Sequence, residues 1–188
     1  TTGFAAQAAG RSDGAALRQI LLQGLLLAVL LALVLGLFAL PFSQLALGLM
    51  QPSADLKQLT LDFFHTRLFG LPAALASYAL VGWFLGTQNA RAPLAILLTT
   101  NLVNIALNLW FVIGLEWGVV GSARASVLAE WTGALLGLAL TQQALRAYPG
   151  KVAWAALALW QSWRPLLAVN RDIFIRSLAL QSVFFLIT

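Results

Sequence analysis

Three asparagines interrupt an apolar run, residues 93–113, that is long enough to cross a membrane. Asn101, Asn104 and Asn108 are spaced so that a helix of 3.6 residues per turn places all three on one stripe. An amide without a partner in hydrocarbon costs several kcal/mol, so this stripe must face other helices or a wet cavity. We interpret it as part of a polar pathway through the membrane. The alternative is that the amides only join helices by hydrogen bonds.

The rest of the chain is similarly apolar. Hydrophobic residues make up 61% of its 188 residues and charged residues 9%, whereas about 25% of a soluble domain is charged. We therefore predict an all-α integral membrane protein. Complete spans of about 20 residues are predicted at residues 20–40, 68–86, 93–113 and 119–140. The apolar ends, residues 1–10 and 173–188, are expected to belong to further helices, which makes the chain an internal fragment.

Basic residues are concentrated in alternate connections between these spans. The second connection contains only Lys57, whereas the first, third and fifth contain Arg11, Arg18, Arg91, Arg146, Lys151, Arg164 and Arg171. By the positive-inside rule, the odd connections face the cytoplasm. The net charge of +5 thus reflects topology. No nucleic-acid partner is expected, because no basic patch is interleaved with aromatic residues that stack on bases.

Two connections are long. Residues 41–56 are predicted to pass the outer surface as a loop with a turn at Pro52. Residues 148–171 begin with Pro149-Gly150 and contain a Trp-rich stretch, residues 151–163, which we interpret as a short helix in the cytoplasmic interface. The predicted organisation is a first membrane lobe at residues 1–147, a linker at 148–170, and the start of a second lobe at 171–188.

Ionisable residues within spans are functional candidates. Glu130 lies near the middle of span 119–140, on one arc with Ser126, and is a candidate proton carrier; the alternative is a carboxylate paired with an arginine. Arg67 is a candidate for a structural ion pair or for transport. Pro72 follows Gly70 at a break in its helix, where it is expected to act as a kink or hinge.

Signatures of enzymes are missing from the sequence. His65 is the single histidine, and the chain has no cysteine. No HExxH, P-loop or GxGxxG pattern occurs. We therefore predict that the protein is not an enzyme and that it holds neither a metal ion nor an organic cofactor.

Four segments in combination resemble the multidrug and toxic compound extrusion (MATE) transporters, and among them the DinF-like branch. These are RLFGLPAAL (67–75), GWFLGTQNARAP (82–93), NLVNIALN (101–108) and WGVVGSARAS (117–126). A fifth, NRDIFIRSLAL (170–180), resembles the start of that family's seventh helix. The resemblance implies a MATE-type helical bundle of twelve helices in two lobes. This chain would then hold the end of the second helix through the start of the seventh.

The resemblance also implies a function. It indicates a multi-pass, monomeric protein of the bacterial inner membrane, in contact with lipids, that exports small organic cations or amphiphilic compounds by alternating access. The coupling ion would be H⁺ or Na⁺. Two alternatives stay open. A lipid-linked oligosaccharide flippase of the same superfamily would have more cationic residues facing its cavity, and a membrane packing subunit would transport nothing.

The resemblance assigns three residues to positions in the family's cation pathway, one as a match and two with a different residue. Asn104 matches an asparagine of the fifth helix, Asn108 stands where many members have an aspartate, and Ser126 stands where many have a threonine on the sixth helix. An amide cannot take up a proton near neutral pH. Coupling by protons would therefore need another carboxylate, and Glu130 is the candidate near the middle of a span.

The predicted topology is testable by labelling. The chain has no cysteine, so single cysteines introduced at positions 14, 51, 90, 116 and 150 report one connection each. We expect an impermeant thiol reagent added outside intact cells to label positions 51 and 116 only, because the basic connections remain inside. Labelling of positions 14, 90 and 150 with none at 51 and 116 would show the opposite orientation.

Overall fold

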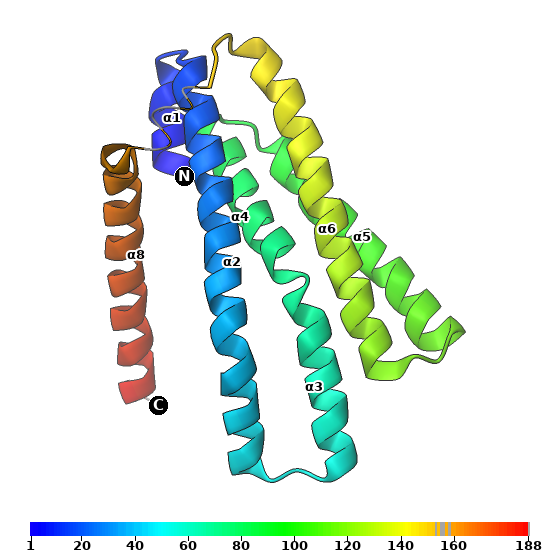
Figure 1. The fold of residues 1–188 in the computed structure, drawn as a ribbon. Coiled ribbons are helices and arrows are strands. Elements are labelled where there is room, and N and C mark those ends of the chain that lie inside the picture. Colours follow the sequence, from blue (N-terminus) through cyan, green and yellow to red (C-terminus); the bar gives the residue numbers. More distant parts are fainter. Residues whose placement is uncertain (153, 155–156, 158, 188) are drawn as a thin grey trace. The chain divides into compact units, whose positions relative to one another are not determined.

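The computed structural model describes residues 1–152, 154, 157 and 159–187, and the chain forms two compact units, Thr1–Gly150 and Lys151–Thr188. Every element of the first unit is helical (Figure 1). In chain order these are α1 (Thr2–Gly10), α2 (Gly14–Met50), α3 (Ala54–Leu68), α4 (Leu71–Gly86), α5 (Arg91–Asn108), the π-helical turn η1 (Leu109–Gly114), α6 (Gly118–Ala144) and the 3-10 turn η2 (Leu145–Ala147). The second unit contains α8 (Trp160–Ile187). The predicted all-α class is confirmed.

Among the described helices, two are long and apolar enough to cross a membrane: α2, and α5 together with η1. The pair α3 and α4 is a third if it is counted as one broken span, bent by 42°. The helix predicted at residues 119–140 is present as α6, 27 residues long. It is not among the candidate spans of the described helices, and it contains Arg124 and Glu130.

The predicted connection at residues 41–56 is wrong for residues 41–50 and 54–56, which are helical, whereas the turn predicted at Pro52 is present. α2 continues through Pro41 to Met50, and the connection to α3 is reduced to residues 51–53. A proline removes one backbone hydrogen bond, which a helix in apolar surroundings tolerates when nearby groups adjust. Here the Ser43 hydroxyl donates to the Leu40 carbonyl at 2.8 Å. The helix ends instead at Gln51, which has the left-handed conformation (φ 45°).

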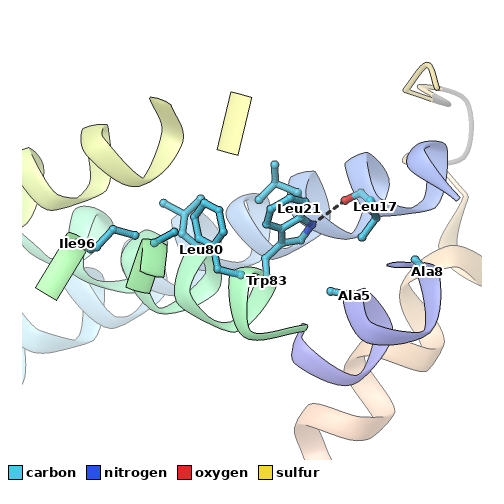
Figure 2. Packing of buried hydrophobic residues seen from close by; sticks show 9 residues of the cluster. Ala5, Ala8, Leu17, Leu21, Leu80, Trp83 and Ile96 are labelled. Carbon is cyan, nitrogen blue, oxygen red and sulfur yellow. Dashed lines mark hydrogen bonds between the residues drawn. The ribbon is translucent and has the colours of Figure 1, made fainter. Parts of the chain in front are cut away.

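The buried core of the first unit lies where α1, α2, α4 and α5 meet (Figure 2). Trp83 is fully buried, packs edge-on against Phe84 at 5.2 Å between ring centroids, and donates from its indole to the Leu17 carbonyl at 3.1 Å. A buried indole needs such a partner for its N–H. The cluster consists of Ala5, Ala8, Leu17, Leu21, Leu80, Trp83, Phe84, Ala92 and Ile96.

Arg18 connects the first turn of α2 to the chain segment that follows α6. The Arg18 guanidinium donates to the carbonyls of Tyr148 at 2.6 Å, Leu145 at 3.0 Å and Gly14 at 3.0 Å. The first two carbonyls follow α6, where a helix end leaves carbonyls without partners and attracts positive charge. Gly14 makes the close approach possible, because a Cβ atom there would collide with the carbonyl oxygens of Tyr148 and Pro149.

The predicted domain limits compare with the structure as follows. The first unit ends at Gly150, three residues after the predicted lobe end at 147. The predicted start of a second lobe at 171 lies inside α8, and the predicted interfacial helix at 151–163 lies partly outside the described residues. The assignment of linker and second lobe therefore stays a prediction.

Candidate functional site

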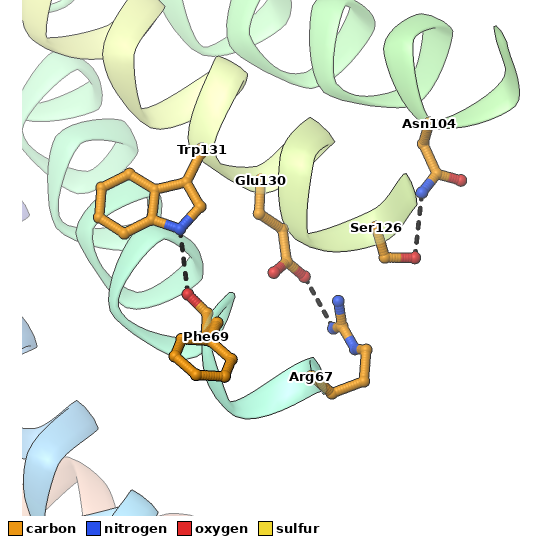
Figure 3. A network of polar contacts seen from close by, with 6 residues as sticks. All are labelled: Arg67, Phe69, Asn104, Ser126, Glu130 and Trp131. Atoms are coloured by element: carbon orange, nitrogen blue, oxygen red, sulfur yellow. Dashed lines mark hydrogen bonds and ion pairs between the residues drawn. The ribbon is translucent and has the colours of Figure 1, made fainter. Parts of the chain in front are cut away.

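The predicted pathway residues form two groups, each shared between α6 and a different helix. Asn104 of α5 meets Ser126, whereas Glu130 meets Arg67 of α3 (Figure 3). Asn108 bonds Asn104 within α5. α6 contacts both α5 and α3. A single helix thus carries both groups, four residues apart, and connects two polar sites inside the bundle.

The asparagine group is a small hydrogen-bonded network. The Asn104 amide donates to the Ser126 hydroxyl oxygen at 3.1 Å, which joins α5 to α6. The Asn108 amide donates to the Asn104 side-chain oxygen at 3.1 Å and to the Asn104 backbone carbonyl at 2.9 Å. The bond from Asn104 to Ser126 is a helix-joining bond of the kind that the alternative interpretation expects. Among the described residues, none donates to the Asn108 side-chain oxygen, so the network retains acceptor capacity.

A cavity of about 730 Å³ opens beside this network. Asn104, Asn108 and Ser122 supply its polar lining, and Phe63 of α3 forms part of its wall. The remaining lining residues are Ile105, Leu109, Val112, Ile113, Gly118 and Val119. Amide groups in an otherwise apolar cavity can orient a small ligand or a partly hydrated cation.

Asn101 does not join this network. Its side chain is exposed and donates to the Leu97 carbonyl of its own helix at 2.9 Å. Helical periodicity places the three asparagines on one stripe of α5. Of these three, Asn104 is the one that bonds α6, through Ser126. Asn101 therefore lies outside the cavity that its two neighbours line.

Glu130 is paired with arginine, as in the alternative predicted from the sequence. Arg67 Nη2 donates to Glu130 Oε1 at 2.7 Å, and the side chains are 34% and 18% exposed. The other two atoms of the pair, Arg67 Nη1 and Glu130 Oε2, are buried without a hydrogen-bond partner. Arg124, on the same helix as Glu130, lies instead over the Trp117 ring, with Cζ 5.0 Å from its centroid.

The ion pair lies at the break between α3 and α4, close to Pro72 in the first turn of α4. A Cβ atom on Gly70 would overlap Glu130 Oε2, so a larger residue there would force the carboxylate to move. Next to it, the Trp131 indole donates to the Phe69 carbonyl at 3.0 Å (Figure 3). α6 thus supplies partners for the interrupted backbone as well as for Arg67. The hinge role of Pro72 stays a prediction.

A second cavity, of about 700 Å³, is lined by this pair. Arg67 and Glu130 are its only charged lining residues, and three phenyl rings contribute to its wall. The apolar lining consists of Leu35, Phe38, Ala39, Pro41, Phe42, Leu45, Phe64, Leu68, Leu71 and Ala74. Because α2 continues through Pro41, residues 41–45 form a wall of this cavity instead of an external loop.

Sequence reasoning missed three contributors to these sites. Gly70 was recognised as part of a break, but nothing in the sequence shows that a carboxylate from another helix lies against it. Trp131 and Phe63 have no local signal either, since an aromatic residue in a span is more often packed against lipid or core. Their roles follow from how α3 and α6 face each other.

Comparisons with known proteins agree with this architecture. The family model described as MatE matches residues 1–110. DNA damage-inducible protein F of Escherichia coli is 40% identical over the whole chain, and the chain spans 41% of that protein's length. Two Arabidopsis thaliana proteins, DETOXIFICATION 43 and the chloroplastic DETOXIFICATION 45, are 30% and 32% identical over 57% and 48% of the chain, which spans 21% and 16% of their lengths. No solved structure matches this chain. The predicted family and DinF-like branch are confirmed.

The fit of Glu130 over Gly70 gives a stability prediction. We expect Gly70→Ala to destabilise the protein by about 1–3 kcal/mol, the usual effect of overpacking. The cause is that the new methyl group displaces the carboxylate and meets Val127 Cγ2 at 3.3 Å. Thermal unfolding of the purified protein, followed by circular dichroism, measures this change. In the double variant with Glu130→Ala, the added cost of Gly70→Ala should largely disappear.

Gly36→Ala is the matched control, since Gly36 lies inside α2 with no heavy atom within 4 Å of its would-be Cβ. It should be neutral or slightly stabilising. Strictly additive effects of Gly70→Ala and Glu130→Ala would contradict the proposed contact.

Proposed function

This chain belongs to the MatE family, and on that basis we propose that it forms part of a secondary active transporter that exports small organic molecules by alternating access. The family consists of membrane transporters and not of enzymes. The apolar helices agree with a multi-pass membrane protein, and the similarity to the E. coli protein supports the bacterial inner membrane. The proposed substrates are organic cations or amphiphilic compounds, handled by a monomer within the lipid bilayer.

The observation that carries this proposal is the amide-lined cavity between α5 and α6. Asn104 and Asn108, which are bonded to each other, line this space together with Ser122 instead of closing it. Amides that served only to join helices would need no cavity beside them. A lined cavity is what a transporter requires in order to hold a solute while each side of the membrane gains access in turn.

Coupling needs an ion as well as a substrate. The proposed coupling ion is H⁺ or Na⁺, and no organic cofactor takes part. The asparagine network has no group that titrates, whereas amide and hydroxyl oxygens suit Na⁺. For coupling by H⁺ we propose Glu130, which lies inside α6 and can exchange Arg67 for a proton as its partner.

Variants of the asparagine stripe test the pathway. We expect Asn104→Leu and Asn108→Leu to reduce drug export by about tenfold or more, because each removes a polar group that the solute would contact. Drug accumulation in cells that express the full-length protein measures export. Asn101→Leu is the matched control and should export normally, since Asn101 bonds only its own helix. Normal export by folded Asn104→Leu and Asn108→Leu would contradict the pathway.

Glu130→Gln tests the coupling ion, because glutamine keeps the shape of the side chain but cannot titrate. In proteoliposomes, we expect drug addition to release protons with the wild-type protein and not with Glu130→Gln. Unchanged proton release by this variant would show that Glu130 is structural, and that another carboxylate carries the proton.

A further inference from the structure

The two charged residues in the cavity between α2, α3, α4 and α6 are held unequally. Glu130 is 18% exposed; Arg67 donates to its Oε1, and its Oε2 is buried beside Gly70 without a hydrogen-bond partner. Arg67 is 34% exposed and reaches the carboxylate at the end of a long, flexible side chain. Arginine can extend its apolar stem while its charged group moves to a wetter position. If the pair separates, Arg67 is therefore the partner that moves away and Glu130 is the one that stays.

This difference between Glu130 and Arg67 favours a cationic ligand over an anionic one. A cation can take the place of the guanidinium on Glu130 and leave a mobile Arg67 to find solvent. An anion on Arg67 would leave the Glu130 carboxylate buried and unpaired, which is strongly unfavourable. The cavity wall favours the same sign, because the faces of Phe38, Phe42 and Phe64 can attract a cation.

The shape and polarity of the cavity define the rest of the ligand. Its volume of about 700 Å³ fits a molecule of drug size. Apart from Arg67 and Glu130, its lining is apolar, so the ligand must be apolar around its charge. A small hydrated cation would gain nothing from ten apolar residues.

We propose that this cavity binds a lipophilic organic cation, which replaces the Arg67 guanidinium on Glu130. The proposal rests on the proposed export function and adds a binding site separate from the asparagine network. Without ligand, Arg67 is an internal counter-ion that neutralises the carboxylate in its apolar surroundings. With ligand, α6 loses its ion pair to α3 and keeps the Trp131 bond to Phe69 at the helix break.

Matched probes of opposite charge test the proposal. Tetraphenylphosphonium and tetraphenylborate have similar size and shape, and equilibrium dialysis measures the binding of each to the full-length protein in lipid nanodiscs. We expect the phosphonium cation to bind the wild-type protein more tightly than the borate anion. Glu130→Gln should weaken binding of the cation by about tenfold, the effect of losing a charge-assisted contact.

Arg67→Gln gives the decisive result, because it removes the competitor of the ligand. We expect it to tighten cation binding by about fivefold, the usual value of a partly exposed ion pair. Simple loss of structure would weaken binding instead. If this variant does not fold, Arg67→Lys, whose ammonium makes a weaker partner than the two-pronged guanidinium, should show a smaller tightening. Gel filtration in detergent checks that each variant is folded.

The outcomes separate this site from the asparagine pathway. Asn101→Leu should bind tetraphenylphosphonium as the wild type does, because Asn101 lines neither cavity. Loss of export in Asn104→Leu, together with probe binding that Glu130→Gln weakens, supports both proposals, and probe binding that ignores Glu130→Gln overturns this one alone. Equal binding of both probes by wild type and Glu130→Gln would show an unselective apolar occupant, such as a lipid acyl chain or a further helix, and would also overturn it.

Discussion

Inside an apolar bundle, polar groups are stabilised by partners within the protein, and three side chains of α6 supply such partners to other helices. Ser126 meets Asn104 of α5, and Glu130 and Trp131 meet Arg67 and Phe69 at the end of α3. Unpaired groups at these positions would each be costly in hydrocarbon. The arrangement of α3 and α5 in this unit therefore depends on the polar side chains of one helix, α6.

Small residues let α6 take this central position. A Cβ atom on Gly133 would collide with the Thr100 side chain of α5, and one on Gly137 would lie 2.8 Å from Leu80 Cδ1 of α4. Gly70, in the break between α3 and α4, likewise leaves space for the Glu130 carboxylate. Close backbone approach and short polar contacts are thus linked, because hydrogen bonds between helices in membranes form where small residues allow contact.

The sequence predicted the helices well and the contacts between them only in part. Periodicity placed Asn101, Asn104 and Asn108 on one stripe, but it could not show that α6 meets this stripe only at Asn104. Local rules made Pro41 a loop residue, although the apolar residues around it carry the helix onward to Met50. The pairing of Glu130 with an arginine was one of two alternatives, because the 63 residues that separate it from Arg67 hide their contact from any local pattern.

Arg18 has one role during membrane insertion and another in the folded protein. As a basic residue in the first connection, it belongs to the charges that orient the chain during membrane insertion. In the finished fold, the same guanidinium bonds the backbone of residues 145 and 148 and draws the chain segment behind α6 against the first turn of α2. An uncharged replacement would weaken both biogenesis and closure of the unit, whereas lysine would preserve the orientation signal and lose the two-pronged bond. Positive charges counted in topology rules are therefore not interchangeable, since some of them are also parts of the architecture.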